Sequence, residues 1–126
     1  MKKDPRIYLA QILERIDRIL QYTSGGKEAF LSDPLIQDAV IRNLEVIGEA
    51  TKRIPQEDKM RHPAIPWKGF AGLRDILIHQ YEGVDLARIW LIVERDLSGL
   101  RNAIGSILPP LEDLEREIAG VDKTES

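Results

Sequence analysis

The feature that most constrains the fold is the spacing of the apolar residues, which recur every three or four positions along most of the chain. An α-helix turns about 100° per residue, so this spacing gathers apolar side chains on one face of a helix. The sequence has no run in which β-branched and polar residues alternate, the pattern typical of a strand. The sequence therefore predicts an all-α protein.

Helix start and stop signals divide the first half of the chain into two long helices. Asp4-Pro5 and Asp33-Pro34 each place a capping side chain before a proline, which suits the first helical position. The segment Ser24-Gly25-Gly26 ends the first helix after about Tyr22, and the second helix stops before Pro55. Because the join between them is short, we expect these two helices to form an antiparallel pair.

The second half of the chain predicts two or three further helices. Residues 55–66 contain three prolines and form a connector with one short turn near residues 57–60. A helix then begins at Trp67 and ends at a turn in residues 82–85, where Asp85 caps a fourth helix that extends to about residue 96. A final apolar stretch indicates a fifth helix or a bent continuation of the fourth: Leu97, Leu100, Ile104 and Ile107. We expect an up-and-down bundle of four to five helices.

Length and charge indicate one domain followed by an acidic tail. The chain has 126 residues, which suits one domain, placed at residues 1–108; Pro109-Pro110 opens the tail at residues 109–126. The tail holds 2 basic and 6 acidic residues, a net charge of −4, whereas residues 1–108 hold 16 basic and 15 acidic residues, a net charge of +1. Charge alone does not predict nucleic-acid binding, so contact with RNA requires a local basic patch.

The sequence lacks three features, and each lack excludes a class of protein. It has no cysteine, so disulfides, thiol nucleophiles and cysteine metal sites are excluded. It has no apolar run near the roughly 18 residues that a membrane span requires. The first sixteen residues are charged throughout and contain no apolar core of a secretory signal. We therefore expect a cytoplasmic protein without a membrane span.

The stretch from Trp67 to Asp85 holds the residues best suited to catalysis. Their spacing gives the pattern Arg74-x4-His79-x-Tyr81. Helical geometry divides the stretch into an apolar face, formed by Phe70, Leu73, Ile76 and Leu77, and an opposite face that carries Arg74, Asp75, Ile78 and His79. We predict that the first face packs in the core and that the second carries the function.

His79 is the one plausible catalytic histidine of the chain. Histidine titrates near neutral pH, which suits a general base. Asp75 precedes it by one helical turn and can orient the imidazole, but such a pair also stabilises a purely structural helix. A lone histidine on a helix is more often structural than catalytic, so these two residues by themselves leave both interpretations open.

The other candidate residues favour structural roles. Glu45 and Glu49 lie one turn apart, but no histidine or aspartate is spaced to complete a metal site, so we expect neither a metal nor a cofactor. His62 lies in the proline-rich connector and is interpreted as structural. Trp67 and Trp90 are expected in the core.

The Arg74-x4-His79-x-Tyr81 pattern resembles the signature of the HEPN superfamily, specifically the HepT-like toxins of bacterial and archaeal toxin–antitoxin pairs. Three flanking blocks add to the resemblance: AVIRNLEVIGEA at residues 39–50, HPAIPW at residues 62–67, and the helix that follows Asp85. The resemblance extends over about residues 5–108. One departure is Glu82, since members of this family often have an aromatic residue after the tyrosine.

The resemblance implies a metal-independent endoribonuclease in which Arg74 and His79 are catalytic. The imidazole of His79 would take the proton from a ribose 2′-hydroxyl, and the Arg74 guanidinium would neutralise the charge that develops on the phosphate. Cleavage also requires an acid, which a second His79 would supply in the cleft of a two-fold homodimer. Ile78, apolar on the polar face, is predicted at the dimer interface; the alternative is that it covers the edge of the core.

The resemblance also implies a partner, a minimal nucleotidyltransferase antitoxin that transfers AMP to Tyr81. A phosphate attached beside Arg74 would occupy the place of the RNA phosphate. The structural alternative for Tyr81 is a ring that closes the end of the helix against the core. At the level of function, the alternative is a catalytically silent HEPN domain that binds nucleotides or serves as an adaptor for a nucleotidyltransferase.

Overall fold

The computed structural model describes residues 4–79 and 85–108, and for residues 74–76, 78 and 79 it describes the backbone alone. The described residues form helices and no strand, which confirms the predicted all-α class. The elements are α1 (Pro5–Tyr22), α2 (Lys27–Ser32), α3 (Pro34–Arg53), α4 (Gln56–Arg61), α5 (Trp67–His79), α6 (Leu86–Leu91), the π-helical segment η1 (Ile92–Asp96) and α7 (Leu97–Ile107).

The two long helices begin and end where the sequence predicts. The carboxylate of Asp4 accepts a hydrogen bond from the backbone N–H of Arg6 at 2.9 Å, and Asp33 accepts one from the N–H of Leu35 at 2.9 Å. Each aspartate thus accepts from a backbone N–H group in the first turn that has no partner within the helix. Gly26 follows α1 with a φ of 92°, a left-handed conformation that glycine adopts without steric cost.

Helix α2 is a feature that the sequence pattern does not predict. It holds six residues, too few to show helical periodicity, and it lies between the stop signal of α1 and the start signal of α3. Its side chain Phe30 is fully buried, and the ring centroid lies 5.6 Å from that of Trp90. The short helix therefore covers one end of the core through a single aromatic side chain.

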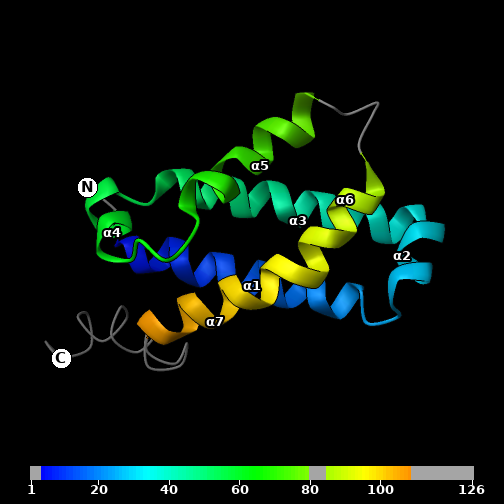
Figure 1. The fold of residues 1–126 in the computed structure, drawn as a ribbon, viewed down its shortest axis with the longest axis horizontal. Helices are drawn as coiled ribbons and strands as arrows, with labels where there is room; N and C mark the ends of the chain where they lie inside the picture. The colour runs from blue at the N-terminus through cyan, green and yellow to red at the C-terminus, as the bar shows by residue number, and fades with distance from the viewer. Residues whose placement is uncertain (1–3, 80–84, 109–126) are drawn as a thin grey trace, which may run out of the picture.

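The four long helical stretches run alternately in opposite directions, as in the predicted up-and-down bundle (Figure 1). Helices α1 and α3 pack side by side and antiparallel, α5 packs against α3, and α7 packs against α1. Their buried side chains form one continuous core. The fully buried members with the largest side chains include Ile12, Ile16, Ile19, Leu44, Ile47 and Leu97.

The last helical stretch is a bent continuation, one of the two possibilities that the sequence leaves open. Helix α6 passes without a break into η1 and then into α7, and the run changes direction in Figure 1. A π-helix bonds residues five apart and inserts an extra residue into the helical repeat, which shifts the faces of the helices on either side. Within this region the indole N–H of Trp90 donates to the carboxylate of Glu94 at 2.8 Å.

None of the described helices combines the length and the apolar character needed to cross a bilayer.

A core substitution on α3 tests the packing that this arrangement implies. We expect Ile47→Ala to lower the free energy of unfolding by about 2–5 kcal/mol, because it leaves a cavity where a side chain with no exposed surface stood. Leu35→Ala on the same helix is the control: that side chain is 77% exposed, so its loss should change stability by less than about 0.5 kcal/mol. Denaturant unfolding measures both, and equal midpoints for the two variants would contradict the packing.

Candidate functional site

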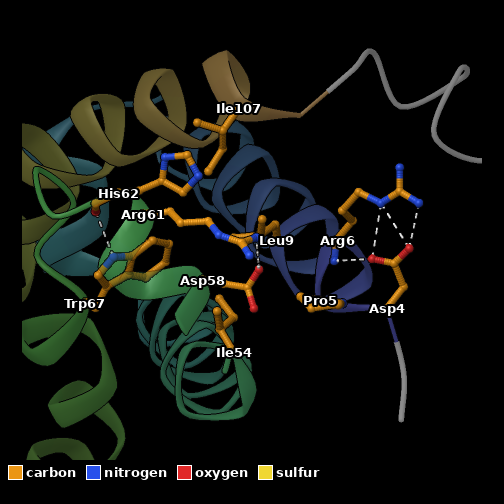
Figure 2. Close-up of a pocket in the computed structure, with 10 residues that line it drawn as sticks. All are labelled: Asp4, Pro5, Arg6, Leu9, Ile54, Asp58, Arg61, His62, Trp67 and Ile107. Carbon is orange, nitrogen blue, oxygen red and sulfur yellow. Dashed lines mark hydrogen bonds and ion pairs between the residues drawn. The ribbon is translucent and has the colours of Figure 1, made fainter. Parts of the chain in front are cut away.

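The first turn of α5 is fixed by Trp67, the residue with which the helix begins. Its side chain is buried, and its indole N–H donates to the backbone carbonyls of Lys59 at 3.1 Å and His62 at 2.9 Å. These bonds tie the start of α5 to the end of α4, as Figure 2 shows for His62 and Trp67. Trp67 is in the core as predicted, and the backbone carbonyl of His62 belongs to the same connection.

A pocket of about 310 Å³ lies beside this connection (Figure 2). Its charged groups are paired locally: Arg61 with Asp58 at 3.5 Å on α4, and Arg6 with Asp4 at 2.6 Å at the start of α1. Hydrogen bonds from the Arg6 guanidinium lower the pKa of the Asp4 carboxyl. The pocket holds none of the catalytic residues predicted from the sequence, and its paired charges favour a structural role.

The apolar face of α5 lies where the helical pattern predicts it. Phe70, Leu73 and Leu77 are all buried, and α5 packs on α3. The fourth predicted member, Ile76, has its side chain outside the described part of the structure. Three buried positions are enough to fix the rotation of the helix about its axis, since they fall within one narrow arc.

Four of the predicted site residues belong to the last two turns of α5. The helical backbone continues through Arg74, Asp75, Ile78 and His79, as predicted. With Phe70, Leu73 and Leu77 inward, helical geometry puts positions 75 and 79 on the opposite side of the helix, about 155–165° from the centre of the buried face. The side chains of these four residues, and the whole of Tyr81, lie outside the described residues.

The chain is described again from Asp85, which caps α6 as the sequence predicts. Its carboxylate accepts hydrogen bonds from the N–H groups of Ala87 at 3.0 Å and Arg88 at 3.3 Å. Trp90, also predicted in the core, is buried one turn later.

Glu45 and Glu49 do not form part of a metal site among the residues that the structure describes. Glu45 pairs with Arg42 at 3.4 Å on the same helix. No group of three or more histidine, aspartate or glutamate side chains with metal-binding geometry occurs within the described ranges.

An open groove next to the motif helix is a feature that the sequence analysis missed. This groove, named here the α5–α7 groove, has a volume of about 740 Å³. One wall is formed by residues 64–66 and the first half of α5, up to Leu73. The opposite wall consists of Arg88, Leu91, Ile92, Arg95, Asp96, Gly99, Leu100 and Ala103. The apolar spacing of residues 91–103 predicts a helix face but not what that face meets, so no sequence signal points to the groove.

Comparison with known proteins identifies the family. The model of the family described as "Ribonuclease HepT-like" matches residues 12–107. A Methanocaldococcus jannaschii protein named "Putative RNase MJ0127" is 41% identical over 97% of this chain and 96% of its own length. "Probable ribonuclease HepT" of Thermococcus cleftensis is 46% identical over 80% of this chain and 93% of its own length.

One relative is longer than this chain and carries a name with two activities. "Gamma-glutamylcyclotransferase and putative RNase MJ0434" of Methanocaldococcus jannaschii is 46% identical over 89% of this chain, which spans 51% of that protein. No solved structure matches the chain significantly. The family model covers the chain from Ile12 within α1 to Ile107 at the end of α7, a range that includes positions 74 and 79 on α5. The chain belongs to the HepT-like ribonuclease family of the HEPN superfamily.

Proposed function

We propose that this protein is a metal-independent endoribonuclease and the toxin of a toxin–antitoxin pair. The observation that carries the proposal is the family membership together with the Arg74-x4-His79-x-Tyr81 pattern in and just after α5. The relatives named above are described as ribonucleases, which supports RNA as the substrate class.

The proposed reaction uses one base, one acid and one cation. His79 removes the proton from a ribose 2′-hydroxyl, and the freed oxygen attacks the adjacent phosphorus. The bond from phosphorus to the 5′-oxygen breaks, and an acid protonates that oxygen. Arg74 stabilises the negative charge on the phosphoryl oxygens as the new bond forms. The products are a 2′,3′-cyclic phosphate and a 5′-hydroxyl end.

The acid in this scheme is the His79 of a second subunit, in a homodimer with a shared cleft. One chain offers two histidines, and His62 lies in the proline-rich connector before α5, outside the motif, where it is interpreted as structural. A two-fold axis near the outer face of α5 brings two copies of Arg74 and His79 together, with Ile78 of each copy at the interface. In Figure 1 the last turns of α5 stand away from the other described helices, which is compatible with this arrangement.

The proposed regulation is AMP transfer to Tyr81 by a nucleotidyltransferase antitoxin. Tyr81 follows α5 by two residues in the sequence, close to both catalytic positions. An adenylate there adds a negative phosphate that competes for Arg74 and obstructs the RNA.

RNA cleavage in the presence of EDTA tests the chemistry. We expect the wild type to cleave a defined RNA and leave a 2′,3′-cyclic phosphate, and His79→Ala and Arg74→Ala to be slower by at least about 100-fold. Arg101→Ala is the control, because Arg101 pairs with Asp17 on α1 at 2.6 Å, away from the proposed site. If folded wild type does not cleave RNA, the protein is instead the catalytically silent adaptor.

Subunit mixing tests whether the site is shared. If each cleft requires two copies of His79, equal amounts of wild type and His79→Ala leave about a quarter of the dimers intact after exchange. Activity per wild-type subunit should then fall to about half of the value without the variant. An excess of Arg101→Ala should cause no such loss. Unchanged activity in the His79→Ala mixture would place a complete site in each chain.

Mass spectrometry after coexpression with a nucleotidyltransferase encoded beside this chain tests the regulation. We expect adenylate mass on the peptide that holds Tyr81 and a loss of RNA cleavage in the modified fraction. Tyr81→Phe should remove the added mass, whereas Tyr22→Phe, at an exposed tyrosine on α1, should retain it. Modification of Tyr22, or of neither tyrosine, would contradict this mechanism.

A further inference from the structure

The α5–α7 groove is an apolar surface that the described residues leave open, with positive charge at its edge. Leu91 lines the groove, and 41% of its surface is exposed, which is a large fraction for a leucine side chain. The groove is formed along a helical run and is large enough for several side chains, which favours a helix as its occupant over a single small ligand.

Two arginines at the groove have no partner among the described residues. The side chains of Arg88 and Arg95 are exposed and make no hydrogen bond or ion pair within the described part of the chain. Asp96 is the one acidic residue among the described residues that line the groove. The groove therefore suits an amphipathic helix with acidic side chains.

The acidic tail of the same chain has this character. Its apolar residues Leu111, Leu114, Ile118 and Val121 are spaced by three and four, which predicts one apolar stripe on a helix. Its net charge of −4, from 2 basic and 6 acidic residues, complements the two arginines. A second copy docked here about a two-fold axis would instead bring four arginines to one contact.

The length of the tail also matches the groove. Helix α7 ends at Ile107, four residues beyond the groove-lining Ala103, so a chain reversal at Pro109-Pro110 would return the tail to that end of the groove. From residue 91 to residue 103 the groove wall measures about 18 Å, and residues 111–121 measure about 15 Å as a helix. We propose that residues 111–121 pack as an amphipathic helix in the α5–α7 groove of their own chain and clamp α5 against α6 and α7. This proposal does not depend on ribonuclease activity.

Disulfide formation tests the docking directly, because the chain has no cysteine of its own. The reporter variant is Gly99→Cys with Leu114→Cys; Gly99 lines the groove, and a Cβ added there meets no atom within 4 Å. The control is Gly105→Cys with Leu114→Cys, since Gly105 is equally open but does not line the groove. We expect the first pair to oxidise about tenfold faster, although residue 105 is nearer to the tail in sequence.

Two further variants check the register and the charge. Gly99→Cys with Arg116→Cys places the second thiol on the opposite face of the tail helix and should oxidise slowly. Arg95→Glu should slow the Gly99–Leu114 pair, whereas Lys68→Glu, outside the groove, should not. If the Gly99 variant does not fold, Ala103→Cys with Leu111→Cys replaces it. Equal rates for the groove and control pairs, or disulfides between chains in place of within them, would overturn the proposal.

Discussion

The placement of α5, the helix that carries the Arg74-x4-His79 motif, depends on the burial of α3 between α1 and α5. The buried residues of α3 span an arc of about 160°, wider than the stripe of about 100° by which a helix packs on one neighbour. This arc is wide enough for two partners, and α1 and α5 both pack on α3. Among the described helices, α5 is therefore placed mainly by its contact with α3.

The broad buried arc of α3 includes polar residues, and the structure satisfies them locally. Asn43 is 5% exposed; its amide donates to the carbonyl of Ala39 at 2.7 Å, and its oxygen accepts from Arg15 of α1 at 3.3 Å. The hydroxyl of Thr51 donates to the carbonyl of Ile47 at 2.7 Å. Buried polar groups destabilise a core when they lack partners, so these bonds allow α3 to be buried on sides that are not wholly apolar.

Local signals account for most of what the sequence predicts correctly. The bounds of α1 and α3 follow from Asp4-Pro5 and Asp33-Pro34, because a cap and a proline act within a single turn. Helix α2 is not predicted because six residues show no helical period, and its one buried side chain, Phe30, contacts Trp90 from a distant part of the chain. The π-helical segment η1 is also not predicted, because its hydrogen bonding has no local sequence signature. This segment lies where the last helical stretch bends.

The sequence by itself determined the catalytic candidates, the helix that carries them and the family. The spacing of Arg74 and His79 on α5, and the inward face of Phe70, Leu73 and Leu77, follow from helical periodicity alone. Only the tertiary structure decided that Trp67 anchors α5 to α4 and that a groove lies between residues 64–73 and 88–103. The physical reason is that the groove joins segments at least 15 residues apart, and the Trp67 bonds close an irregular loop of five to eight residues. Periodicity and capping report only on neighbours within one regular helix.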